Sequence, residues 1–392
     1  KLCCTCFYYI AFSILGLAGA AWGPSLNILA VHTNCMIQEI SLIFIALYLG
    51  GLAGSFGSGF LFDRLPGHRV LAASLGLMAF FLFLIPMMRS LAALCCLVLC
   101  FGASVATLNV GGNVLIIRNF PLNFAPVMNG LHLAAGIGFI ISPLAVSWSV
   151  LNSGDIFPIY RIFAILSIFT AICLFFLPEP DFCYSSESLN VLSPSSQKIF
   201  RLSLLFMVFY GGVEAGFGNW IFNYAKSAAN MDNFQAARLN SGFWIAFTFG
   251  RFAAIFLSFR LSPFAMLCFD IVGCLLSLSV MAVFSDSSLF ILIGSLGFAF
   301  STASVFPSML SFIQNYMPLS GAVTGKFMIA TGIGAMFFPW FIGQLFETVG
   351  HQILVFTMLF IFVAVSIILW VIRFTSLDCD FFDYNGLHDL KS

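Results

Sequence analysis

A single carboxylate stands deep inside an apolar segment. Glu214 lies near the middle of the apolar run over residues 200–222 and is the only acidic residue deep in the first, fourth, fifth or seventh such run. An ionisable group at the centre of a membrane helix costs about 2.5–3.5 kcal/mol on insertion scales, so it persists where it faces a partner or a cavity. Glu214 is therefore predicted to couple a proton or cation, to accept hydrogen bonds from a solute, or to bond a neighbouring helix.

Amide, imidazole and indole side chains accompany this acid. Amides offer two donors and one acceptor to hydroxyl groups, and an indole ring offers an apolar face to the C–H side of a sugar. Small polar residues also join packed helices, and aromatic residues also anchor membrane interfaces, so each has a structural alternative. The candidate solute-binding residues are Asn27, Asn109, Asn113, His132, Asn219, Trp220 and Asn223.

The spacing of Glu214 and Asn219 leaves two arrangements open. At 100° per residue the two side chains lie roughly 140° apart around one helix, so a straight helix cannot present both to one cavity. Either the helix breaks at residues 216–218, as transporter helices do at substrate sites, or Glu214 faces a different neighbour.

Two further charges are predicted to lie at equal depth on adjacent helices. Arg251 precedes the turn around Arg260 and Asp270 follows it, at nearly equal distances along the chain. We expect an Arg251–Asp270 ion pair that neutralises both charges and acts as a structural or gating bridge.

No motif for a cofactor accompanies these residues. The sequence has no G-x-x-x-x-G-K-[ST] loop for nucleotide, and its 12 Cys lie mostly in apolar runs without metal-ligand spacing. Neither ATP, zinc nor disulfides are expected.

The composition identifies the solvent of these segments as lipid. The 392 residues are 61% hydrophobic and 8% charged, against roughly 25% charged in a soluble domain. Lys plus Arg and Asp plus Glu are 15 each, so there is no basic surface for nucleic acid. Twelve apolar runs of spanning length follow, at residues 7–30, 41–60, 70–88, 91–117, 126–150, 156–177, 200–222, 235–258, 263–284, 288–313, 319–346 and 352–372. The fold class is an all-α membrane protein with twelve transmembrane helices.

The runs divide into two similar halves. A polar connection over residues 178–199 separates a six-helix half over 1–177 from another over 200–373, and residues 374–392 form a tail. Residues 135–138 (AGIG), followed by Pro143, match residues 331–334 (TGIG), followed by Pro339, at a shift of 196. Two repeated halves with a substrate site between them describe a transporter that works by alternating access.

The positive charges orient the chain in the membrane. An even number of spans places both termini on one side, and cytoplasmic termini leave only Arg89, Arg161, Lys226 and Arg238 of the basic residues on the outer half. The positive-inside rule therefore predicts cytoplasmic termini in the plasma (cell inner) membrane.

The loop after the second run carries a family motif. Residues 59–69 (GFLFDRLPGHR) resemble the signature G-x-x-x-D-R-x-G-x-R of the major facilitator superfamily, with Pro66 as one extra residue. The resemblance implies the superfamily fold of two pseudo-symmetric halves. It also implies that Asp63, Arg64 and Arg69 latch the halves in one state, as charges at helix ends can.

Three further segments resemble a narrower branch. Residues 108–113 (LNVGGN), 129–132 (NGLH) and 210–221 (YGGVEAGFGNWI) are similar to the fucose permease and sodium-dependent glucose transporter branch. This resemblance implies a monosaccharide carried with H+ or Na+. The acidic residues central to fucose permease in the first and fourth spans have no counterpart here, where Asn27, Asn109 and Asn113 stand.

The sequence thus predicts a secondary active transporter for a sugar or similar small polar solute. We expect a monomer in contact with lipid, coupled to H+ or Na+ through Glu214, without enzymatic activity. The alternative is an exporter of amphipathic compounds on the same fold, with its Phe and Met residues lining an adaptable cavity.

Overall fold

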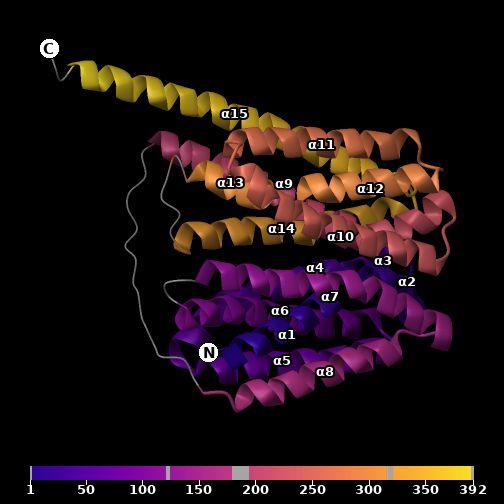
Figure 1. The fold of residues 1–392 in the computed structure, drawn as a ribbon. Coiled ribbons are helices and arrows are strands. Elements are labelled where there is room, and N and C mark those ends of the chain that lie inside the picture. Colours follow the sequence, from indigo (N-terminus) through magenta and orange to yellow (C-terminus); the bar gives the residue numbers. More distant parts are fainter. Residues whose placement is uncertain (1, 121–123, 179–193, 315, 317–320, 390–392) are drawn as a thin grey trace.

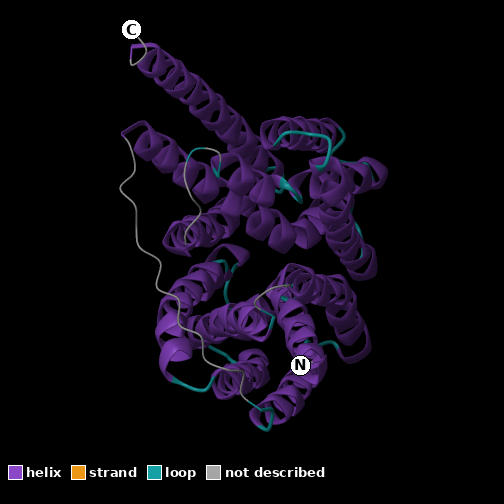
Figure 2. Cartoon of the chain, turned by 60° about the vertical axis from the view of Figure 1, so that its left-hand side comes forward, coloured by secondary structure: helices purple, strands orange, loops and turns teal. Residues whose placement is uncertain are grey.

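The protein is built of helices. The computed structural model describes residues 2–120, 124–178, 194–314, 316 and 321–389, and these residues form helices and their connections without a strand (Figure 2). The predicted connection over 178–199 lies mostly outside the described residues.

The first half holds the predicted spans one to six. Its helices are α1 (Leu2–Gly19), α2 (Trp22–Thr33), α3 (Ile37–Ile40), α4 (Leu42–Arg64), α5 (Gly67–Leu84), the 3-10 turn η1 (Ile85–Met87), α6 (Leu91–Asn119), α7 (Phe124–Ser153) and α8 (Phe157–Phe175). Helices α1 and α2 meet at a bend of 51° and are long and apolar enough for one span when they are counted together.

The second half holds the predicted spans seven to twelve. Its helices are α9 (Pro194–Ala229), α10 (Asn233–Ser258), α11 (Pro263–Val283), α12 (Ser288–Thr302), α13 (Val305–Ile313), α14 (Gly321–Phe346) and α15 (Ile353–Asp389). In the described residues, 11 helical stretches are long and apolar enough to cross a membrane, and the bent pair brings the number to 12. The predicted all-α membrane fold is confirmed.

The two halves lie side by side, with α4 against α14, α7 against α10 and α2 against α9 (Figure 1). We call one end of the bundle the basic end, because Arg64 and Arg118 lie in the last turns of α4 and α6 there and Arg260 lies in the α10–α11 connection. The other, which carries the α2–α3 and α9–α10 connections, is the opposite end.

The repeat seen in the sequence is a repeat of close helix contacts. A Cβ atom on Gly138 of α7 would lie 2.1 Å from the Ser13 carbonyl oxygen of α1. A Cβ atom on Gly334 of α14 would lie 1.7 Å from the Val208 carbonyl oxygen of α9. Each half therefore packs its first and fifth spans backbone to backbone at corresponding glycines, as small residues allow in lipid.

Corresponding residues of the two halves also meet each other where α2 crosses α9. A Cβ on Gly23 would lie 2.6 Å from the Asn219 carbonyl oxygen, and the Asn27 amide donates to the Asn223 side-chain oxygen at 2.7 Å. Each pair is 196 residues apart, the shift of the sequence repeat. The crossing therefore lies on the pseudo-twofold axis that relates the halves.

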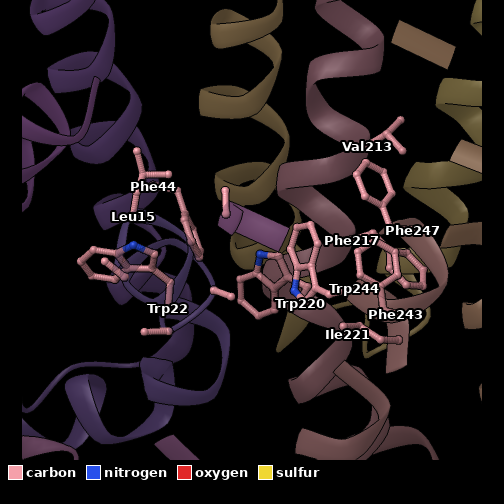
Figure 3. Packing of buried hydrophobic residues seen from close by; sticks show 14 of the residues in the cluster. Leu15, Trp22, Phe44, Val213, Phe217, Trp220, Ile221, Phe243, Trp244 and Phe247 are labelled. Carbon is pink, nitrogen blue, oxygen red and sulfur yellow. The ribbon is translucent and has the colours of Figure 1, made fainter. Parts of the chain in front are cut away.

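Aromatic side chains fill much of the interior around this crossing (Figure 3). Trp22 packs edge-on against Phe101 in the first half, with ring centroids 5.5 Å apart. Trp220 lies in the second half, fully buried, and its ring contacts Phe44 of the first half at 6.3 Å. Because these rings are buried, they act as packing bulk between helices.

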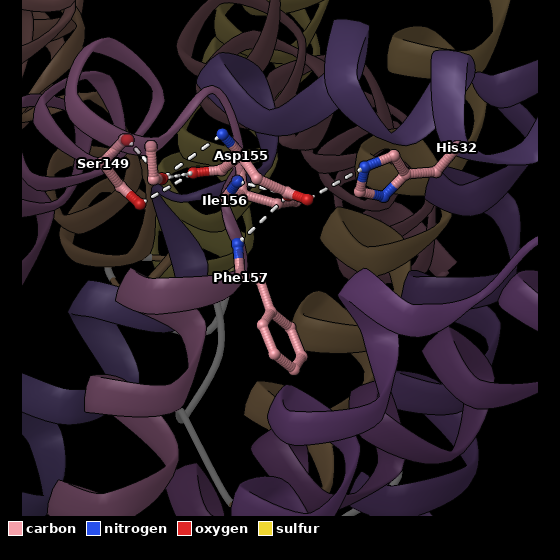
Figure 4. Close-up of polar contacts among 6 residues, drawn as sticks. His32, Ser149, Asp155, Ile156 and Phe157 are labelled. Carbon is pink, nitrogen blue, oxygen red and sulfur yellow. Dashed lines mark hydrogen bonds and ion pairs between the residues drawn. The ribbon is translucent and has the colours of Figure 1, made fainter.

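A polar cluster holds the opposite end of the first half together (Figure 4). Asp155 accepts hydrogen bonds from the amides of Ile156 and Phe157 at the start of α8, at 2.6 and 3.2 Å. Its other oxygen lies 3.4 Å from His32 Nε2 of α2. Asp155 therefore both caps α8 and ties it to α2.

Candidate transport site

A cavity of about 920 Å³ lies between the two halves. Helices α1, α6 and α7 line it from the first half, and α9, α10, α11 and α13 from the second. It reaches from Phe139 and Trp244 in the interior to Gly130, Leu261 and Ser311 near the basic end. Its size and mixed apolar and polar lining suit a small solute.

Side-chain hydrogen bonds join the halves at the opposite end. Gln344 of α14 exchanges two hydrogen bonds with Gln38, at 3.1 and 2.8 Å, and donates a third to the Ser41 hydroxyl at 3.1 Å. The Ile37 amide donates to the Glu347 carboxylate at 3.1 Å. The cavity therefore reaches toward the basic end, while bonds close the opposite end.

The predicted acid lines this cavity. Glu214 on α9 lies 3.9 Å from Arg251 on α10, and the two side chains are 34% and 45% exposed. Helix α9 runs unbroken from Pro194 to Ala229. The helix is therefore not broken at residues 216–218, and Glu214 turns to Arg251 while Asn219 bonds the Ala215 carbonyl.

The predicted pairing of Arg251 with Asp270 is wrong in this structure. Arg251 turns to Glu214, whereas the buried Asp270 accepts a hydrogen bond from the Ser304 hydroxyl at 2.7 Å. Helix α10 directs Arg251 into the cavity, whereas α11 directs Asp270 toward the turn between α12 and α13.

Two aromatic rings from different halves meet at the inner wall of the cavity. Phe139 of α7 stacks on Trp244 of α10, with centroids 4.6 Å apart and an interplanar angle of 18°. The Trp244 Nε1 is buried and has no hydrogen-bond partner among the described residues. Thr248, one turn further on α10, also lines the cavity. This wall therefore consists of aromatic rings, with one unpartnered N–H donor buried behind the surface.

Some of the predicted solute-binding residues are at the cavity. Asn109 and His132 line it. Asn113 donates to the backbone and side-chain oxygens of Asn109, at 2.8 and 3.0 Å, so the two amides form one polar unit on α6. His132 packs edge-on against Phe12, with centroids 6.1 Å apart.

The other predicted solute-binding residues lie away from the cavity wall. Asn27 and Asn223 bond each other between the halves, and Trp220 donates its Nε1–H to the Pro339 carbonyl at 2.9 Å. Asn219 donates to the Ala215 carbonyl at 2.7 Å and lies beside the Tyr48 hydroxyl. In this conformation these four side chains join helices.

The charged loop between α4 and α5 is described only in part, because the Asp63 side chain lies outside the described residues. The Arg64 guanidinium lies over the Phe60 ring at 3.8 Å, and that of Arg69 lies 5.9 Å from the Phe175 ring. Arg118 of α6 donates to the Phe62 carbonyl at 3.0 Å, which ties the end of α4 to α6.

Sequence reasoning missed Phe139, Thr248 and Tyr48. The chain has 50 Phe residues, so nothing in its type distinguishes Phe139 from residues that face lipid. Among the described residues, no group of three or more His, Cys, Asp or Glu side chains could hold a metal ion. The cavity thus offers hydrogen bonds, aromatic faces and one ion pair.

Comparison with known proteins agrees with this architecture. The family model described as Major Facilitator Superfamily matches residues 2–339. Sodium-dependent glucose transporter 1A of Mus musculus is 31% identical over 377 residues, covering 86% of this chain and 88% of that protein. Sodium-dependent glucose transporter 1 of Homo sapiens is 29% identical over 372 residues, covering 86% and 72%.

Solved transporters share the fold. The nucleoside transporter NupG superposes with a TM-score of 0.72 at 16% identity, covering 96% of this chain and 98% of that one. A bacterial homolog of the human lysosomal transporter Spinster, in an inward-facing and unoccupied conformation, gives 0.73 at 15% identity, covering 96% and 97%. The chain belongs to the Major Facilitator Superfamily, and it is a membrane transporter rather than an enzyme.

Proposed function

We propose that the protein carries a monosaccharide, or a similar small polyhydroxylated solute, across the membrane by alternating access coupled to an ion. The observation that carries this proposal is the cavity between two repeated halves, which hydrogen bonds between the halves close at the opposite end. Its relatives, named as sodium-dependent glucose transporters, support a sugar as solute and Na+ over H+ as the ion.

The cavity wall suits a sugar ring. The Phe139 and Trp244 rings line the cavity and give it an apolar wall for the C–H groups of a sugar. Asn109 and His132 supply donors and acceptors from the first half. Since both halves contribute, a bound solute draws them together.

Glu214 is the residue we assign to coupling. Its carboxylate lies at the limit of ion-pair distance from Arg251, and both groups reach the cavity. A solute hydroxyl can therefore bond either Glu214 or Arg251. Such a bond weakens the ion pair and leaves the other side chain less tightly held. Solute binding and the electrostatics of the second half are thereby linked, as thermodynamic coupling requires.

Opening of the opposite end completes the cycle. We propose that the hydrogen bonds made by Gln38, Gln344, Asn27 and Asn223 break when the halves rock, and that the freed amides then face the incoming solute. Of the remaining candidates, Trp220 joins α9 to α14, while Asn113 and Asn219 bond carbonyl groups one turn back in their own helices.

Counterflow tests the transport proposal. Purified protein in vesicles preloaded with unlabelled monosaccharide should exchange labelled sugar, and an inward sodium gradient should drive net accumulation. No exchange of any monosaccharide, together with accumulation of hydrophobic dyes, would instead show export of amphipathic compounds.

We further propose that the basic end faces the cytoplasm, with both termini there, in the plasma membrane. Cys35 in the α2–α3 connection gives a test at the opposite end. An impermeant maleimide added outside intact cells should label the protein, and Cys35→Ser should reduce this labelling. Burial, and to a lesser extent the Glu39 carboxylate, raise the pKa of the Cys35 thiol against the opposing Thr33 contact, so labelling should quicken as pH rises.

A further inference from the structure

A buried carboxylate in the second half has no cationic neighbour. Asp270 is 4% exposed, and no Lys, Arg or His lies within ion-pair distance of it among the described residues. Within the described part of the chain, the side-chain hydrogen bond to Asp270 comes from Ser304. A carboxylate removed from water is costly unless a cation or several donors compensate it, so this group requires an explanation.

The segment that faces Asp270 interrupts a membrane span. Helix α12 ends at Thr302, α13 begins at Val305, and Ala303 and Ser304 form a turn between them. Pro307 has no amide proton, so the Ala303 carbonyl lacks the donor that a continuous helix would provide. Carbonyl groups at such interruptions coordinate Na+ in secondary transporters.

Close packing holds α11 against this interruption. Cys274 lies one turn beyond Asp270 on α11, and its Sγ is 3.2 Å from the Thr302 hydroxyl. A Cβ on Gly273 would lie 2.3 Å from the Ser301 hydroxyl oxygen, so α11 and α12 touch here. The carboxylate, the Ser304 hydroxyl and the backbone oxygens of the turn are therefore grouped in one place.

The group is also reached from the transport cavity. Ser304, Pro307 and Ser308 line the cavity, while Asp270 lies behind Ser304. Among the residues that the structure describes, Glu214 has a cationic partner in Arg251, whereas Asp270 has none. The place left for an added positive charge is thus beside Asp270.

We propose that Asp270, the Ser304 hydroxyl and the carbonyl groups of the α12–α13 turn form a sodium-binding site. The Asp270 carboxylate supplies the charge, and the Ser304 oxygen accepts the ion while its hydrogen still bonds Asp270. This inference rests on the proposed ion-coupled transport, because it assigns the place of the coupling ion. Tyr210 of α9 hydrogen-bonds the Thr302 carbonyl at 3.4 Å and lies near Glu214 and Arg251, so it connects the sodium site to the solute cavity.

Direct sodium binding tests the site without any solute. Purified full-length protein is incubated with radiolabelled sodium at constant pH, with potassium as the competing salt, and the bound label is counted. Asp270→Asn should abolish saturable binding, and Ser304→Ala should weaken it roughly tenfold through loss of one ligand.

Matched variants separate binding from folding. Asp286→Asn removes an exposed carboxylate in the α11–α12 connection, and Ser279→Ala removes an exposed hydroxyl of α11 that donates to the Leu275 carbonyl and lies outside the cavity lining. Both should bind sodium as the unmodified protein does. If the size-exclusion profile shows that Asp270→Asn fails to fold, the sodium affinity of Ser304→Ala tests the site instead.

Three results would overturn the site. These are normal sodium binding by Asp270→Asn and Ser304→Ala, loss of binding in Glu214→Gln instead, and no sodium binding by the unmodified protein. If the last result accompanies sugar exchange and accumulation driven by a pH gradient, the ion is a proton and the transport proposal stands without this site. Sodium binding without sugar exchange would keep the site and reject the proposed solute.

Discussion

The ion pair between Glu214 and Arg251 is loose and reaches the aqueous cavity. At 3.9 Å, with both side chains about one-third or more exposed, it resembles surface pairs that contribute about 1 kcal/mol or less. A pair of this strength separates readily when a solute hydroxyl or an ion competes for one partner. It is therefore suited to a residue that changes partners during transport.

Replacing Glu214 with Gln should separate coupled transport from exchange. We expect Glu214→Gln to retain counterflow of labelled solute, because the amide still bonds hydroxyl groups, but to lose gradient-driven accumulation by about tenfold or more. Both activities are measured in the same vesicles.

The control for this variant is Glu39→Gln, at an exposed position at the opposite end. It should retain both activities. Equal loss of exchange and accumulation in Glu214→Gln would assign that residue to solute binding or to structure instead.

Residue types in the sequence were enough to predict part of the site. The rest depends on the direction in which each side chain points, which the sequence does not show. Glu214 was predictable because a carboxylate in an apolar run is rare. The partner of Arg251 was not, since equal depth along two helices says nothing about the direction in which each side chain points. Phe139 was hidden among the other phenylalanines, and only its contact with Trp244 distinguishes it.

At the level of helices, close glycine contacts set how the first and fifth spans of each half pack. A methyl group on Gly334 would collide with the Val208 backbone, which cannot move aside like a flexible side chain. We expect Gly334→Ala to destabilise the protein by about 1–3 kcal/mol, the usual cost of overpacking. Thermal unfolding in detergent, followed by size-exclusion chromatography, measures the loss.

Gly76→Ala is the matched control for this prediction. Gly76 lies inside α5, and a Cβ there meets no atom within 4 Å. Ala favours the helix by roughly 1 kcal/mol over Gly, so this variant should be neutral or slightly more stable. A Gly334→Ala variant as stable as Gly76→Ala would show that α9 and α14 can separate without cost.

Span positions were predictable, but interruptions within spans were not. Runs of about 20 apolar residues locate membrane helices because the lipid core sets their length. The bend between α1 and α2 and the turn between α12 and α13 leave the hydropathy of their spans unchanged. Pro24 and Pro307 are local signals, since each removes a backbone donor next to one of these interruptions.

For the whole molecule, the contacts at the opposite end decide which side of the cavity is open. Gln344→Ala removes three hydrogen bonds between the halves, with a net loss of roughly 1–3 kcal/mol. We expect this change to shift the population toward opening at that end. Deuterium uptake by the backbone of residues 34–41 should then increase.

Gln352→Ala serves as its control. Gln352 lies near the same end, and its buried side-chain oxygen has no hydrogen-bond partner among the described residues. Deuterium uptake should therefore stay as in the unmodified protein. Unchanged uptake in Gln344→Ala as well would show that other contacts keep this end closed.

The architecture was predictable from composition, span number and the repeat at a shift of 196, because each follows from the bilayer and from duplicated packing. The end at which the cavity opens was not predictable, since one sequence must allow both arrangements of its halves. Which hydrogen bonds form in a given state depends on small free-energy differences between these two arrangements.

The contact of Asn27 with Asn223 places one side-chain type opposite its own copy on the pseudo-twofold axis. An amide can donate to and accept from an identical amide, so such a contact is self-complementary, as at the interface of a twofold dimer. Two separate six-helix chains with the same Asn could have met in the same way before they became one polypeptide. Once the halves were joined in one chain, the sequence of each half was free to change separately. Glu214 and Arg251 accordingly stand in the second half alone.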